Sequence, residues 1–165
     1  MEEVYDRDDN VLAVRAAVEN FFDTDDVKHK PFNEHNVARA TYSIGAKFGH
    51  ATVIFHAYSD KLMLHVMIPL NAAKEERAKV GEFLHRANYG LKVGSFDFDY
   101  DDGEISYRIT LFCGSDEFAP PTYEQIRFSV ILGLMMVEKY GDALVKVMFG
   151  LVEPVDAVEA AEADD

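Results

Sequence analysis

A β-hairpin within residues 83–113 constrains the fold of this chain more than any other stretch. Aromatic and branched residues alternate with polar ones on both sides of Asp102-Gly103, a pair that favours a two-residue type I′ turn. Such a turn keeps one face of the hairpin apolar, whereas a three-residue loop would mix the two faces. The opposed pairs in this register are Tyr100 with Ile105, Phe98 with Tyr107, Phe96 with Ile109, and Asp97 with Arg108. The sequence therefore predicts two antiparallel strands, with an ion pair on their exposed face.

Three further strands are predicted ahead of this hairpin. Alternating residues favour strands near 37–45, 50–58 and 61–69, with a two-residue turn at Ser59-Asp60 between the last two. This turn places Phe55 opposite Leu64 and Val53 opposite Val66, so that one face of the sheet stays apolar. The opposite face is mixed and carries Thr52, Ile54, His56, Tyr58, Lys61, Met63 and His65.

Helical spacing of apolar residues predicts helices near 10–23 and 72–89, and a last helix that begins after Thr122 and runs towards Phe149 past a weak point at Gly141. We expect Asn71 to cap the second helix and Gly90 to end it in a left-handed conformation. Thr122 and Gln125 have the spacing of a capping box. Residues 24–35, which include Pro31, are predicted to form a loop. The order α-β-β-β-α-β-β-α predicts an α+β domain with an antiparallel sheet.

The net charge of −14 lies mainly at the two ends of the chain. Residues 1–10 carry −4 and residues 150–165 carry −6, which leaves −4 for the body between them. We therefore expect an acidic N-terminal tail at 1–9, one domain at 10–150, and an acidic C-terminal tail at 151–165 that is a frayed helix or disordered. Removal of 152–165 should then leave the fold intact.

The charge pattern also limits the partners of this chain. A mildly acidic body argues against binding to nucleic acid or to an anionic membrane, because both need a basic surface. Lys28-His29-Lys30 is the only basic cluster and is too small to supply one. The start of the chain, Met-Glu-Glu-Val-Tyr-Asp, lacks the basic segment of a secretory signal, and the longest apolar run is too short for a membrane span. A cytoplasmic location is expected.

Catalytic and metal motifs find little support. Cys113 is the single cysteine and ends an apolar strand face, which is typical of an inert core thiol in a reducing compartment. An EF-hand calcium loop that started at Asp97 would need Gly where this chain has Asp102 and Glu where it has Arg108. Neither position matches, so the motif is not an EF-hand. His56 and His65 share the mixed sheet face, but His50 is too distant to be a third ligand. We predict no catalytic residues, no cofactor and no metal site.

The last predicted helix has two apolar faces. Its core stripe consists of Ile126, Val130, Val137 and Leu144. The opposite side of the helix carries Phe128, Ile131, Leu132 and Met135 among charged residues. A helix that covers one sheet needs only the first stripe, so the second is covered either by another helix of the same chain or by a partner. These four residues are the candidate protein-interaction site.

A resemblance to a known family rests on the stretch described first. The segment from Asn88-Tyr89-Gly90-Leu91 through Gly94-Ser95-Phe96, followed by Tyr107-Arg108, resembles the YbjN-type bacterial proteins, which are described as sensory transduction regulators. The likeness spans about residues 36–150. It implies the fold of type III secretion chaperones, a homodimer, and action by binding protein. It brings no catalytic residues.

Two main functional hypotheses follow. The first is a non-enzymatic cytoplasmic protein-interaction module, chaperone-like or regulatory, that binds a protein partner. The second is a small-molecule-binding domain or small enzyme with a pocket between the last helix and the sheet. A metal sensor at the histidine face is a weaker third. The lack of catalytic motifs, the acidic body and the second apolar face of the last helix favour the first.

Overall fold

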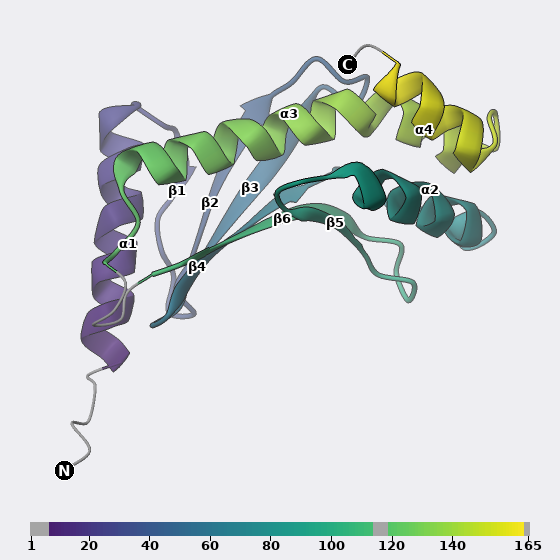
Figure 1. The fold of residues 1–165 in the computed structure, drawn as a ribbon. Helices are drawn as coiled ribbons and strands as arrows, with labels where there is room; N and C mark the ends of the chain where they lie inside the picture. The colour runs from purple at the N-terminus through teal and green to yellow at the C-terminus, as the bar shows by residue number, and fades with distance from the viewer. Residues whose placement is uncertain (1–6, 114–118, 164–165) are drawn as a thin grey trace.

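The computed structural model describes residues 7–113 and 119–163, and these form an α+β fold around one antiparallel sheet (Figure 1). The strand order in the sheet is β1-β2-β3-β4-β6-β5. The helices are α1 (Arg7–Thr24), α2 (Arg77–Gly90), α3 (Tyr123–Met148) and α4 (Pro154–Glu162). The strands are β1 (His29–Lys30), β2 (Val37–Ser43), β3 (His50–Ala57), β4 (Lys61–Met67), β5 (Ser95–Phe98) and β6 (Ile105–Phe112). The predicted fold class and the predicted order of the main elements are confirmed.

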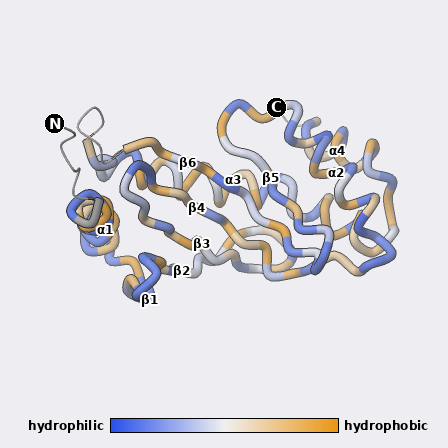
Figure 2. Tube along the Cα trace, turned by 90° about the horizontal axis from the view of Figure 1, so that it is seen from below, coloured by the Kyte–Doolittle hydropathy of each residue, from blue (hydrophilic) through white to orange (hydrophobic). Residues whose placement is uncertain are grey.

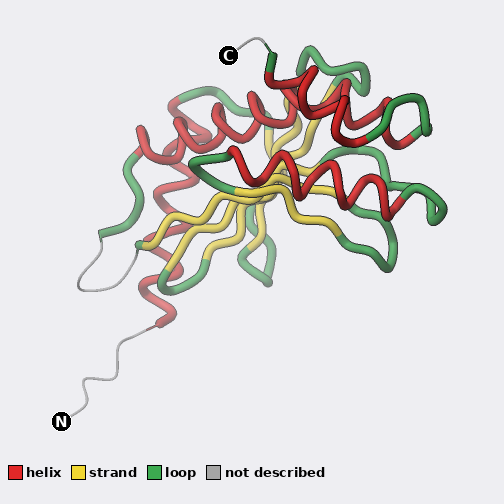
Figure 3. Tube along the Cα trace, turned by 45° about the vertical axis from the view of Figure 1, so that its right-hand side comes forward, coloured by secondary structure: helices red, strands yellow, loops and turns green. Residues whose placement is uncertain are grey.

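The described helices pack on one face of the sheet. Helix α3 lies across this face, α1 stands at its β1–β3 end, and α2 and α4 lie together at the other end (Figures 1 and 3). The tube coloured by hydropathy shows polar and apolar residues alternating along the strands (Figure 2). This alternation is expected when an antiparallel sheet has only one covered face. Among the described residues, no helix is both long enough and apolar enough to cross a bilayer.

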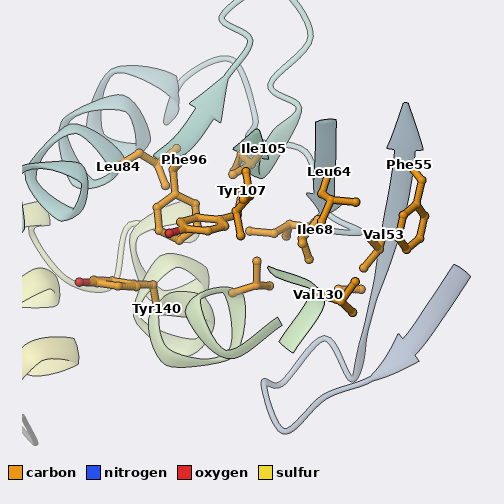
Figure 4. Packing of buried hydrophobic residues seen from close by; sticks show 14 of the residues in the cluster. Val53, Phe55, Leu64, Ile68, Leu84, Phe96, Ile105, Tyr107, Val130 and Tyr140 are labelled. Atoms are coloured by element: carbon orange, nitrogen blue, oxygen red, sulfur yellow. The ribbon is translucent and has the colours of Figure 1, made fainter. Parts of the chain in front are cut away.

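The core fills the space between α3 and the sheet. Val53, Phe55 and Leu64 from the central strands are fully buried, and Val130 of α3 belongs to the same cluster (Figure 4). At the β5 end, the ring of Phe96 meets the ring of Tyr107 edge-on at 5.0 Å. The predicted apolar face of the sheet is therefore the covered one.

The register of β3 and β4 agrees with the prediction. Phe55 faces Leu64 and Val53 faces Val66. The register of β5 and β6 differs by two residues, because Phe96 faces Tyr107 rather than Ile109. A shift of two residues keeps every side chain on its predicted face of the sheet. The predicted faces are therefore correct, whereas the predicted loop length is wrong.

A four-residue loop replaces the expected two-residue turn. The loop closes between Asp99 and Glu104, where the Asp99 N–H donates to the Glu104 carbonyl at 3.0 Å. The Arg77 guanidinium holds it by donating to the carbonyls of Tyr100 and Asp101 at 2.9 and 2.8 Å. Gly103 alone takes a left-handed conformation here, with φ +81°. Contacts to α2 therefore outweigh the local preference of Asp-Gly for a type I′ turn.

Asp97 and Arg108 pair across this hairpin even though they are not directly opposite. Arg108 Nε lies 2.7 Å from Asp97 Oδ2, and Nη2 donates to Oδ1 at 3.1 Å. Asp97 faces Ser106 in the ladder, so the ion pair runs diagonally. The predicted contact is confirmed, whereas the predicted direct opposition is wrong.

We expect Asp97→Ala to change stability little, because half-exposed ion pairs contribute about 0–1 kcal/mol. In a thermal melt followed by circular dichroism, the midpoint should fall by no more than ~4 °C. Loss of the folded state would contradict this estimate and show that the pair is needed for the hairpin to form.

The ends of α2 differ from the prediction. The helix begins at Arg77 rather than near 72, and Asn71 does not cap it but donates from Nδ2 to the Asp102 carbonyl at 3.3 Å. Gly90 is the last helical residue and has no positive φ, which occurs instead at Gly94. Asn88 explains the exit of the chain, because its side chain bonds both the N–H and the carbonyl of Phe96, at 2.7 and 2.9 Å. These bonds lead the chain directly into β5.

The segment expected to be an acidic tail contains a packed helix. Pro154, Ala157 and Val158 of α4 are buried against α2 and α3. The Tyr140 hydroxyl donates to Glu162 Oε1 at 2.8 Å and joins α3 to the end of α4. The expectation that the fold tolerates removal of 152–165 is therefore reversed. A second difference lies in the loop predicted at 24–35, which includes the two-residue strand β1.

Candidate functional site

Helix α3 is built as its sequence predicts. The Thr122 hydroxyl accepts from the Gln125 N–H at 3.2 Å, and the Gln125 side chain accepts from the Thr122 N–H at 2.8 Å, which completes the capping box. The core stripe is buried at all four predicted positions: Ile126, Val130, Val137 and Leu144. This stripe determines which side of α3 is turned away from the sheet.

The outward side of α3 exposes an apolar patch. The side chains of Phe128, Ile131 and Met135 are 63%, 38% and 57% exposed. Leu132 lies at the edge of this group and packs partly against the core. We call Phe128, Ile131, Leu132 and Met135 the α3 outer patch. Although α1 and α4 both contact α3, neither covers the three exposed members, so no helix of the described residues closes this surface.

An open groove adjoins the patch where the end of α1 meets the start of α3. Its walls are Thr24, Asp25, Asp26, Tyr123, Glu124, Arg127, Phe128 and Ile131. Asp25 organises the groove, since it accepts from the Tyr123 hydroxyl at 2.5 Å and lies 3.3 Å from Arg127 Nε. The hydrogen bond to Asp25 raises the pKa of Tyr123. Burial, followed by the Asp25 charge, raises the pKa of Tyr42 to about 12.

The β2–β3 loop limits the patch at its other end. Glu138 accepts from the Gly45 N–H at 2.9 Å, and Asp142 accepts from the Lys47 N–H at 2.7 Å. A Cβ at Gly141 would lie 2.9 Å from the Ala46 Cβ, so this glycine permits a close contact with the loop. Gly141 is thus a packing position within a continuous helix rather than a weak point. The outer patch is confined to the first half of α3.

The contact between α3 and the sheet is too tight at its centre for the pocket considered above. A Cβ at Gly133 would lie 2.7 Å from Val66 Cγ2, and Ile109 and Tyr107 close the same point. Close-packed interiors have few voids larger than a water molecule. A ligand between the last helix and the sheet would therefore find no space at Gly133.

Cys113 is held in the core, as its place in the sequence suggests. It is buried, and burial raises the pKa of its thiol to about 11. The thiol therefore stays protonated at neutral pH and is a poor nucleophile.

The two histidines of the mixed face are close together. The ring centroids of His56 and His65 lie 5.4 Å apart. Burial lowers the pKa of both, and the positive charge of Arg39 lowers that of His56 further. Within residues 7–113 and 119–163, no three side chains of a metal-binding type gather into one site. At neutral pH these imidazoles are mainly uncharged.

An exposed surface beside α4 was also missed by sequence reasoning. Tyr89 is 96% exposed and lies in a shallow groove between α2 and α4, with Arg86 and Val155 beside it. The helical pattern of 72–89 gave no reason to single out this residue. The groove exists only because α4 packs against α2, which the acidic composition of 151–165 conceals.

A comparison with protein families gives a match that covers most of the chain. A family model for YbjN, described as "Putative bacterial sensory transduction regulator", matches residues 15–146. This range includes the groove, the outer patch and all six strands. No curated protein matches the sequence.

Proposed function

The chain belongs to the YbjN family, and from this premise we propose that it is a regulatory, non-enzymatic protein that acts by binding other protein chains through the α3 outer patch. The family description names a regulator rather than an enzyme. The observation that carries the proposal is the exposure of Phe128, Ile131 and Met135 on one side of a rigid, capped helix. Apolar groups of this size, grouped on a helix, are typical of protein contacts.

A second copy of the same chain is the occupant that we propose. At 100° per residue, Glu124, Phe128, Ile131, Met135 and Lys139 fall on one stripe of α3. An antiparallel α3 from a second copy, related by a two-fold axis between Ile131 and Leu132, would set Phe128 against Met135. The same axis would set Glu124 against Lys139 at both ends. The stripe is thus self-complementary, as a symmetric dimer requires.

Burial of the exposed part of these side chains would favour such a contact. Full burial of a side chain of this type contributes ~1.5–3 kcal/mol, and both copies contribute the same residues. Loss of translational and rotational freedom opposes this gain. Methionine adapts its shape to an opposing surface, which suits Met135 to a self-contact and also to an amphipathic segment of a client protein. A chaperone-like role would use the same patch.

The proposed place of action is the cytoplasm. The lone, buried thiol of Cys113 suits a reducing compartment. Cytoplasmic action also fits a regulator that works by contact with other chains.

Charge substitutions in the patch test the proposal. Ile131→Asp and Met135→Asp should each shift the protein to a smaller mass in multi-angle light scattering, because a buried carboxylate at the dimer centre opposes association. Far-UV circular dichroism should remain that of the wild type. Leu12→Asp is the matched control, since Leu12 is a 56% exposed apolar residue on α1, far along that helix from the groove.

Two results would contradict the proposal. One is an unchanged mass in both patch variants. The other is a loss of mass in Leu12→Asp as large as that in Ile131→Asp, which would indicate a general effect of added charge.

A further inference from the structure

The uncovered face of the sheet carries a basic corner that the linear sequence does not reveal. Strand β1 pairs with β2 so that Lys30 lies directly opposite Arg39. Lys28, Lys30 and Arg39 line a shallow hollow together with His29, Thr41 and Thr52. The three cations come from two segments, and only the topology brings them together. We call these three residues the basic corner.

The backbone that presents the basic corner is anchored to the core. The ring of His29 stacks on Phe22 with centroids 4.1 Å apart, and its Nδ1 lies 2.8 Å from the Val27 carbonyl. Successive residues of a strand point to opposite faces, so Lys30 points away from the face on which His29, itself exposed, meets Phe22. Lys30 therefore projects from β1, and Lys28 directly precedes this strand.

No carboxylate of the described residues lies within ion-pair distance of the basic corner. Of the neighbouring acids, Asp25 holds Arg127 and Glu34 lies 3.5 Å from His35 Nε2, while Asp26 forms no ion pair with the corner. The lowered pKa of His56, caused by burial and then by Arg39, agrees with a positive potential on this face.

We propose that the basic corner binds an extended acidic segment of a partner protein. Side chains on one face of an extended segment repeat every ~6.6 Å, and Lys28, just before β1, lies two residues from Lys30 within it. The Thr41 and Thr52 hydroxyls, 2.9 Å apart, add hydrogen-bonding groups beside Arg39. Arg39 can hold a carboxylate with two parallel N–H donors.

Other anionic occupants fit less well. Nucleic acid binding depends on many phosphate contacts, and three cations on an acidic protein provide few. An acidic segment of a separate protein chain, which complements the charge of these three cations, is the occupant that we infer.

Binding of a labelled peptide tests this inference. The probe is a fluorescent twelve-residue Glu-Ser repeat, titrated with the full chain in fluorescence anisotropy at low salt. Lys30→Glu and Arg39→Glu should each weaken binding by about tenfold or more, equivalent to ~1.4 kcal/mol. Lys92→Glu, an exposed cation outside the corner, is the control and should change the affinity less than about twofold. Ile131→Asp should leave peptide binding intact, which separates this inference from the dimer proposal.

Four outcomes would overturn the inference. The first is no anisotropy change with the wild type at low salt. The second is an equal loss in Lys92→Glu. The third is displacement of the peptide by millimolar inorganic phosphate, which would indicate a simple anion pocket. The fourth is equally tight binding of single-stranded oligonucleotide. Circular dichroism of each variant ensures that the fold is retained.

Discussion

Deletion of residues 152–165 is expected to destabilise the protein by roughly 3 kcal/mol or more. Burial of a valine-sized side chain contributes ~1.5–3 kcal/mol, and α4 buries Val158 together with Ala157 and Pro154. Removal of α4 also exposes apolar surface on α2 and α3 that it now covers. The bond from Tyr140 to Glu162 is lost as well. The ion pair of Lys79 with Glu153 at 2.8 Å is exposed and adds little.

The measurement is thermal unfolding of the truncated chain, with a drop in midpoint of about 6–12 °C expected at 2–4 °C per kcal/mol. A chain that lacks only residues 163–165 keeps α4 and is the matched control. The longer deletion removes six acidic residues, which should reduce charge repulsion and act in the stabilising direction. A midpoint within 2 °C of the wild type would show that α4 contributes no net packing.

Gly103→Val is expected to have the second large effect. The left-handed φ of +81° costs a side-chain-bearing residue ~1–2 kcal/mol, and more when the side chain is branched at Cβ. A Cβ at this position would also lie 2.2 Å from the Ala72 carbonyl oxygen. Because that neighbour is backbone, the loop must move, and it would break the 2.8 Å bond from the Ala72 N–H to the Gly103 carbonyl. We expect a loss of ~3 kcal/mol or more.

Gly90→Val is the matched control for this substitution. Gly90 lies at the end of α2 without a positive φ, and the nearest atom to a Cβ there is Glu162 Oε1 at 3.5 Å. Chemical denaturation of both variants should show a much lower midpoint for Gly103→Val. Equal midpoints would mean that the 99–104 loop relaxes without loss of its contacts to α2.

The strand registers show how far the sequence predicts this fold. The alternation of apolar and polar residues is sufficient to predict the register of β3 and β4. A shift of this register by one residue would turn Phe55 and Leu64 towards solvent. The same rule selects the faces of β5 and β6 but cannot distinguish a two-residue loop from a four-residue loop. Arg77 and Ala72 decide that choice, and both are distant in sequence from Asp102-Gly103. The prediction fails where tertiary contacts outweigh local turn preference.

The packing of helix α4 and the presence of strand β1 were missed for different reasons. The buried side of α4 consists of small residues and Pro154, so it lacks the strong apolar stripe that a pattern search detects. Its acidic composition also resembles that of a solvated tail. Strand β1 has only two residues, which is too short for any alternation to be visible.

The candidate site was predictable in part. The exposed positions Phe128, Ile131 and Met135 follow from the helical period, because they lie opposite a stripe of core residues. The groove beside them was not predictable, since it depends on where the end of α1 meets Tyr123. The basic corner likewise requires the pairing of β1 with β2, which places Arg39 beside Lys30.

A photo-crosslinker in the outer patch tests the central claim most directly. With p-benzoylphenylalanine in place of Phe128, irradiation of the purified chain should give an adduct of twice the chain mass, with the crosslinked peptide mapping around Met135. The same amino acid in place of Phe149, which is 69% exposed at the end of α3, should give little adduct. The absence of an adduct from position 128, or equal adduct from position 149, would contradict the claim that the α3 outer patch is a protein-binding surface.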